Sequence, residues 1–278
     1  MSIQKLPLAA LQQVRQYIKS TITLTDVDQK FQDWAMLGDF EDLPEPASVD
    51  NLSSIFSFGS LSVEQVPSQG SWVVSTVNPG AALVKLPGLS LEPGVRMVGY
   101  VYRAKEDGVG VVWAVPEQLS TTVLLEKAIA STQPSHQPQP EGALDHFMEA
   151  VTGDRSAVSF MVASLLRREL EEFGAVGQRC TWSQHTLIDA LPLPPDQWQW
   201  KHQQPTDMAP KVKIMPDGQA AVEFFSWRTT HPIALFRHIE LYPPEMYVSK
   251  SQNQEITTSC KIPAAIAQPK VWHSQRRE

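Results

Sequence analysis

An α+β fold with mainly antiparallel strands is predicted by two features of the sequence. First, Asp107-Gly108 and Asp217-Gly218 each separate two apolar stretches that have the composition of strands. Such pairs are typical of tight hairpin turns, because aspartate and glycine tolerate the positive φ angles that these turns need. Second, the helical patterns do not alternate with the strands, so no parallel βαβ arrangement is expected. We therefore expect sheets built from hairpins, with helices packed on one face of each sheet.

Two helices and a loop are expected in the first part of the sequence. Apolar residues recur at helical spacing over 8–18, and Pro7 suits the first turn of a helix. A second helix is expected to start at Thr25, whose hydroxyl is a suitable N-terminal cap, and to end at Gly38. The acidic stretch 39–50 is expected to be an exposed loop.

The composition then becomes typical of strands. The segments 71–77, 81–86 and 95–105 are rich in valine, tyrosine and small residues, and glycine or proline turns bound them. The stretch 109–115 is expected to complete the first hairpin. A helix over 120–132 is expected to follow.

The strongest helical pattern of the chain lies at 156–173, where a broad apolar stripe precedes Gly174 as the C-terminal cap. Arg167 and Arg168 each stand four residues before a glutamate, which places both pairs on the solvent-facing side of this helix. A shorter helix is expected at 143–151.

A second hairpin is expected from strands at 211–215 and 220–227, followed by a third strand at 233–242. The preceding stretch 191–210 is rich in proline and tryptophan and is expected to be irregular. From 251 to 278 the sequence is expected to be a loose tail.

The stretch 132–142 contains three prolines and several glutamines, which predicts an extended connector. We expect it to join an N-terminal α+β segment, 1–131, to a C-terminal α+β segment, 143–250. A single domain in which the connector is a long surface loop is the alternative.

The composition limits the possible functions. The chain of 278 residues has 42% hydrophobic residues and a formal net charge of -7. That charge makes general nucleic-acid binding unlikely, since the phosphate backbone needs a cationic surface. The two cysteines, together with the lack of a signal-peptide pattern or a long apolar run, predict a cytoplasmic protein that neither enters a membrane nor belongs to a disulfide-rich class.

Two weak catalytic candidates can be named. Cys180 and His185 pair a thiol with the usual base, although their spacing does not bring them together on a regular helix or strand. His238 and Glu240 lie two residues apart on an expected strand, so they share a face and form a possible acid/base pair. A structural role is the commoner explanation for both pairs. The histidines and cysteines lack the short spacing of a metal site, and we expect neither a metal nor a cofactor.

Trp198 and Trp200 lie in the proline-rich stretch 191–210 and are the candidates for binding a protein partner. An exposed indole buries much area at a small cost in entropy, whereas buried indoles cover the edge of a core. Our leading hypothesis is a non-catalytic protein-protein interaction protein, such as an adaptor or assembly factor. The alternatives are an enzyme with a cleft between the two segments and an RNA-associated factor.

Overall fold

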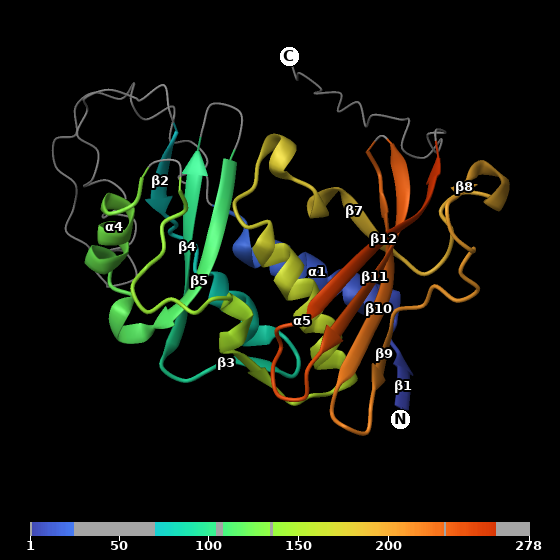
Figure 1. Ribbon diagram of the computed structural model, residues 1–278, viewed down its shortest axis with the longest axis horizontal. Coiled ribbons are helices and arrows are strands. Elements are labelled where there is room, and N and C mark those ends of the chain that lie inside the picture. Colours follow the sequence, from blue (N-terminus) through green and yellow to red (C-terminus); the bar gives the residue numbers. More distant parts are fainter. Residues whose placement is uncertain (1, 25–69, 104–107, 134–135, 231, 260–278) are drawn as a thin grey trace, which may run out of the picture.

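The computed structural model describes residues 2–24, 70–103, 108–133, 136–230 and 232–259. Their fold is α+β, and all the strand pairs within the sheets are antiparallel, as the sequence predicts. Two main sheets enclose a layer of helices, as Figure 1 shows.

The large sheet has the strand order β1-β9-β10-β11-β12-β8, with β7 also paired to β10. Most of it comes from the last quarter of the described chain, whereas β1 comes from the start of the chain. Its strands are β1 (Ser2–Lys5), β7 (His185–Ile188), β8 (Gln199–Trp200), β9 (Lys211–Ile214), β10 (Ala220–Arg228), β11 (Ile233–Tyr242) and β12 (Lys250–Ser259).

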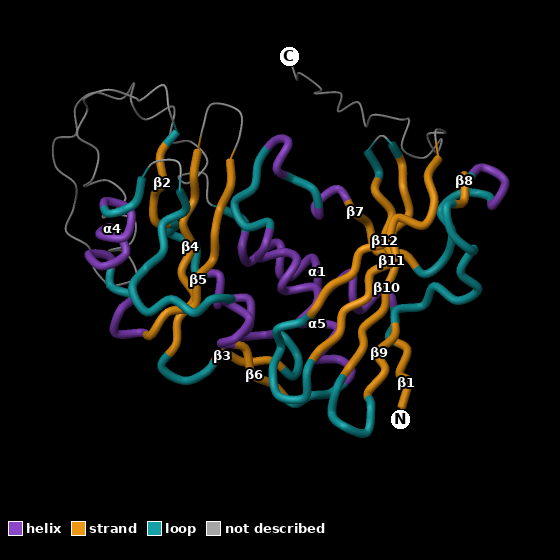
Figure 2. The backbone as a smooth tube through the Cα atoms, in the orientation of Figure 1, coloured by secondary structure: helices purple, strands orange, loops and turns teal. Residues whose placement is uncertain are grey.

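Two smaller sheets lie on the other side of the helices. One has the order β2-β4-β5, and the other pairs β3 with β6, as can be followed in Figure 2. Their strands are β2 (Ser71–Val74), β3 (Leu89–Leu91), β4 (Val95–Arg103), β5 (Gly108–Pro116) and β6 (Val151–Gly153).

The helices α1 (Leu8–Ile22) and α5 (Ala157–Glu171) pack against each other between the two main sheets. α5 contacts β9 and β10 on one side and β5 on the other. Its N-terminus is capped by the hydroxyl of Ser156, which accepts a hydrogen bond from the backbone N–H of Ser159. α4 (Thr122–Ala130) lies on the side of the β2-β4-β5 sheet that points away from α5, and it packs against β2.

Both hairpins are confirmed. β4 and β5 pair in a register that sets Arg103 opposite Gly108, so Gly108 is the first residue of β5 and not, as the sequence predicts, part of the turn. The residues 104–107 lie outside the described residues. β9 and β10 pair directly, and Gly218 in their turn has a φ of 83°, which glycine adopts without strain. The third strand has the predicted bounds, Ile233–Tyr242, and α1, α4 and α5 lie where helices are expected.

Three predictions of local structure are wrong. The residues 81–85 belong to a 3₁₀ helix, η2 (Pro79–Lys85), which starts where the side chain of Asn78 caps the N–H of Gly80. Within 143–151 the only helical turn is η4 (Phe147–Ala150), and β6 follows at once. The residues 251–259 are not a loose tail but form most of β12. The helix expected from Thr25 lies outside the described residues.

The division of the chain at the connector stays a prediction, but several contacts cross it. β1 pairs with β9, and α1 packs against α5. One continuous core cluster includes Leu11 and Val101 from before the connector together with Phe160 and Val212 from after it. The described part of the connector contacts β5, where the indole N–H of Trp113 donates a hydrogen bond to the carbonyl of Pro138.

Candidate functional site

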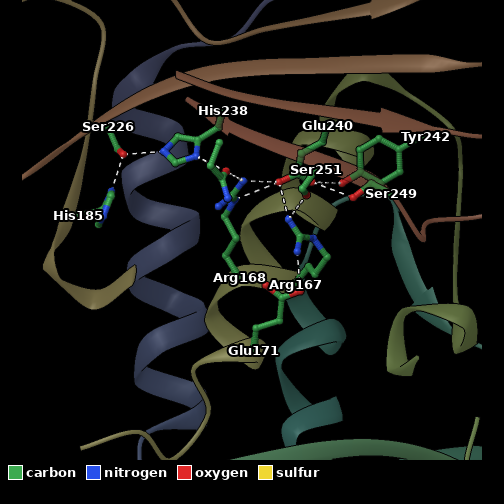
Figure 3. A network of polar contacts seen from close by, with 11 residues as sticks. Arg167, Arg168, Glu171, His185, Ser226, His238, Glu240, Tyr242, Ser249 and Ser251 are labelled. Carbon is green, nitrogen blue, oxygen red and sulfur yellow. Dashed lines mark hydrogen bonds and ion pairs between the residues drawn. The ribbon is translucent and has the colours of Figure 1, made fainter. Parts of the chain in front are cut away.

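A cluster of polar side chains lies between α5 and the large sheet, and we call it the polar network (Figure 3). Its centre is buried, whereas Ser251 and Asn253 at its margin are exposed. His238 and Glu240 are two residues apart on β11 and share one face, as the sequence predicts. That face is the inner one, because their neighbours on β10, Phe224 and Val222, belong to the main core. The members of the polar network are Arg167, Arg168, His185, Ser226, His238, Glu240, Tyr242, Ser249, Ser251 and Asn253.

Glu240 is the central acceptor of the polar network and has no exposed surface. Its Oε1 accepts hydrogen bonds from Nη2 of Arg167 at 2.8 Å and from Nε of Arg168 at 3.0 Å. Its Oε2 accepts hydrogen bonds from the hydroxyls of Tyr242 at 3.0 Å and Ser249 at 3.1 Å. Burial alone raises the pKa of this carboxyl, but the two guanidinium groups outweigh burial and hold the pKa below its ordinary value. Glu240 is therefore a charged carboxylate with both oxygens fully engaged.

The placement of Arg167 and Arg168 on the solvent-facing side of α5 is wrong. Both side chains point into the protein and are more than nine-tenths buried. Arg167 does pair with Glu171, as expected, whereas Glu172 accepts hydrogen bonds from the backbone N–H groups of 181–183. The reason is that α5 lies between two sheets, so nearly all of its circumference faces protein.

A chain of hydrogen bonds links Arg168 to His185, and the donor and acceptor at each step can be assigned. Arg168 donates to Oδ1 of Asn253 at 2.8 Å, which fixes this atom as an acceptor, so Nδ1 of His238 must donate to it at 2.7 Å. Nε2 of His238 then carries the lone pair and accepts from the hydroxyl of Ser226 at 2.7 Å. The Ser226 oxygen in turn accepts from Nδ1 of His185 at 2.8 Å. The arginine thus determines the tautomers of both histidines.

Both histidines are neutral in this environment. Burial, and after it the charge of Arg168, lowers the pKa of His238 to about 3. Burial, and after it the charges of Arg228, Arg15 and Arg168, lowers the pKa of His185 to about 4. The hydrogen-bond chain agrees with these directions, since a protonated His238 would turn Nε2 into a second donor facing Ser226.

Ser226, His238 and Asn253 have the hydrogen-bond order of a nucleophile, a base and an orienting group. A substrate has no access to the serine or the histidine, because Ser226 has no exposed surface and His238 is 2% exposed. Cys180 lies outside the polar network, and its thiol donates a hydrogen bond to the carbonyl of Ala175. The structure therefore joins three of the four catalytic candidates, of which His238 and Glu240 are buried and His185 is half-buried.

Sequence reasoning missed the polar partners on β10 and β12. Ser249, Ser251 and Asn253 alternate with period two, which is the signal of one strand face. The lack of apolar residues in this stretch hid the strand. Ser226 carries no such signal, because it stands among the aromatic residues of β10.

A second buried ion pair connects α1 to α5 and was also missed. Nε of Arg15 pairs with Oε1 of Glu169, and this oxygen also accepts the indole N–H of Trp182 at 2.6 Å. Arg15 donates further to the carbonyls of Trp182 and His185, and its guanidinium lies 4.4 Å from the centre of the Trp182 ring. Arg15 thus links α1 to the start of β7 through hydrogen bonds.

Trp198 and Trp200 lie on the other face of the large sheet. Trp198 is 5% exposed, belongs to the second core cluster with Phe225 and Leu235, and donates its indole N–H to the carbonyl of Leu193. Trp200 is half-buried against the same cluster. The Trp198 indole is therefore not presented to a partner in this structure.

We call the face of the large sheet that points away from α1 and α5 the outer face. The segment 191–208 covers one part of it, and two rows of side chains cross the other part. The strand register gives the first row as Ile3, Lys213, Ala221, Leu241 and Lys250. The register gives the second row as Lys5, Lys211, Glu223, Ile239 and Gln252. Every side chain in these rows is at least partly exposed, so this part of the outer face is open.

A polar pocket of about 370 Å³ lies where the open and covered parts of the outer face meet. Its floor comes from the strands and its wall from 202–207. Glu223 on this floor holds two cations, Nε of Arg237 at 3.0 Å and Nζ of Lys211 at 3.5 Å. Asp207 on the wall pairs with Lys5 and Lys211.

Within the ranges that the structure describes, no group of three or more histidine, cysteine, aspartate or glutamate side chains is arranged to hold a metal ion. In the same ranges no helix has the length and apolar character that a membrane crossing requires. Comparisons with family models, with curated proteins and with solved structures found no match for this chain.

Proposed function

We propose that this protein is a non-catalytic protein-protein interaction protein, such as an adaptor or assembly factor, which docks an acidic partner on the open part of its outer face. The observation that carries the proposal is the charge of this surface. The strands place five cations on the outer face against one acid, Glu223, although the whole chain has a net charge of -7. The five cations are Lys5, Lys211, Lys213, Arg237 and Lys250.

Two of these cations are available to a partner. Lys211 and Arg237 are held by Glu223, and Lys5 by Asp207. Among the described residues, Lys213 and Lys250 make no ion pair. They stand three strands apart in one row, which is about 14 Å at the usual strand spacing. An acidic surface of a partner protein that spans these strands contacts both.

The apolar residues of the same rows favour a protein over a nucleic acid. Ile3 is 63% exposed and Leu241 is 49% exposed, and Leu241 lies between Lys213 and Lys250 in the row. Single-stranded nucleic acids are usually held by exposed aromatic rings beside the cations, and these two rows contain no aromatic residue. A mixed apolar and cationic surface fits a protein segment of acidic and apolar residues.

The catalytic alternative is less favoured by the geometry. The polar network provides a serine, a base and an orienting amide, but Ser226 is sealed from solvent. Glu240, the other acid/base candidate, is occupied by two arginines and two hydroxyls. These groups account for one another, so they need no substrate to explain them.

The test is affinity purification of the tagged protein from its native cells, with quantitative mass spectrometry. We expect an acidic partner to be lost with the double variant Lys213→Glu/Lys250→Glu. The matched control is Lys85→Glu/Lys127→Glu, which makes the same change in net charge at two exposed positions of η2 and α4. Thermal unfolding of all three proteins verifies their folds. Equal recovery of every partner by the two variants would refute the proposal.

A further inference from the structure

β1 is the last strand at one end of the large sheet, and within the described part of the chain no other strand pairs with its outer side. All four of its residues are exposed. The free edge of such a strand presents backbone groups to which another chain can add.

The hydrogen bonds of the segment identify the groups that point outward. The N–H of Leu6 donates to the carbonyl of Pro210, so Leu6 faces the β9 side. In an antiparallel pair successive residues point their backbone groups to opposite sides, so Gln4 faces β9 as Leu6 does. The N–H and C=O groups of Ile3 and Lys5 therefore point to the free edge.

The side chains beside this edge carry positive charge. Ile3 is paired with Lys213 and Lys5 with Lys211, so the edge opens directly onto the two rows of the outer face. A strand added to β1 would place its own outward side chains about 5 Å from those of Ile3 and Lys5. Acidic residues at alternate positions of that strand would lie beside Lys5, whose ammonium group they would share with Asp207, and about two strand spacings from Lys213.

We propose that one segment of the acidic partner binds as an extended strand that adds to β1 and forms backbone hydrogen bonds with Ile3 and Lys5. This inference rests on the proposed function, since it specifies how the partner meets the same surface. Strand addition requires a partner segment in which acidic residues recur at every second position, because only one face of the added strand lies beside the lysines.

A second copy of this chain fits the same edge poorly. Pairing two β1 strands would bring Lys5, Lys211 and Lys213 of both copies onto one small surface, and like charges on neighbouring strands are destabilising. The strand is also short, carries a lysine and is followed by Pro7, which are the usual protections against self-association.

The binding test uses a fluorescein-labelled peptide of eight residues that alternate glutamate with valine, measured by fluorescence anisotropy at low salt. Ile3→Pro removes an outward N–H that β9 does not use, and proline is tolerated in edge strands. Its matched control, Ile3→Thr, removes the same apolar side chain but keeps the N–H group. We expect Ile3→Pro to weaken binding about tenfold relative to Ile3→Thr. A peptide N-methylated at alternate residues should bind the unmodified protein about tenfold more weakly, and one with lysine for glutamate should not bind.

The outcomes separate the two proposals. If Ile3→Pro and the N-methylated peptide both bind as well as their controls while Lys213→Glu/Lys250→Glu weakens binding, strand addition is wrong and the basic docking face stands. If the acidic peptide binds no better than the lysine peptide, both proposals fail. A dimer that Ile3→Pro dissociates would show that a second copy occupies the edge and would overturn the inference.

Discussion

Replacing Glu240 by glutamine tests whether the polar network is held together by a buried charge. Glutamine has nearly the same shape, so its amide oxygen can still accept from Arg167 and Arg168. The hydroxyls of Tyr242 and Ser249 can rotate to accept from its amide nitrogen. The substitution therefore removes the charge and leaves the hydrogen-bond geometry in place.

The expected loss of stability follows from the partners that each arginine keeps in the variant. Arg167 keeps the carboxylate of Glu171 and the hydroxyl of Ser251. Arg168 keeps the neutral Asn253 and the ring faces of Trp182 and Phe224, but no carboxylate. One buried guanidinium is thus left without a compensating charge. Removing one partner of a buried pair costs about 3–5 kcal/mol, so we expect Glu240→Gln to lower the free energy of unfolding by that amount.

Urea unfolding followed by circular dichroism measures this free energy. The control is Glu255→Gln, which removes the carboxylate of an exposed pair with Lys201 and should cost at most about 1 kcal/mol. If Glu240→Gln cost no more than this control, the burial of the charge would not be what stabilises the polar network, and the reasoning would be wrong.

Two further predictions concern His238 and Trp198. The folded-state pKa of His238, about 3, lies below its unfolded value of about 6.5, so the folded protein binds fewer protons and stability falls as the pH drops below about 6.5. At pH 5 the loss attributable to His238 should be about 2 kcal/mol relative to pH 7, and His238→Gln should flatten this part of the pH profile of unfolding; an unchanged profile would contradict a neutral, buried imidazole. Trp198→Ala should cost about 3–5 kcal/mol because it empties a buried site, and Trp200→Ala, at a half-buried site, should cost less. Urea unfolding measures both costs, and equal stability of Trp198→Ala and the unaltered protein would mean that the indole is not part of the core.

Local chemistry was sufficient to predict the hairpins and the main helices. Asp217-Gly218 specifies its turn through the φ that Gly218 adopts, and the strand 233–242 is bounded by residues that cannot continue a ladder. Ser156 and the apolar stripe behind it specify α5. The period of two also predicted that His238 and Glu240 share a face, which is the part of the polar network that one strand determines alone.

Which face of an element meets protein was decided by the tertiary structure. A solvent-exposed side was expected for α5. The helix instead lies between the large sheet and the sheet that contains β5, and Arg167 and Arg168 point to Glu240. β12 has too few apolar residues to be recognised as a strand. Its Ser251 and Asn253 stay exposed to solvent and also accept hydrogen bonds from Arg167, Arg168 and His238, which only the folded protein brings opposite them.

The sequence by itself determined the α+β class, the turn at Asp217-Gly218 and the pairing of the strands within each hairpin, because these depend on residues a few positions apart. The tertiary structure alone decided the buried charge network, the burial of Trp198 and the basic row on the outer face. Each of these joins segments far apart in the chain, as β1 joins β9, and the burial that fixes their energy exists only after those segments have met.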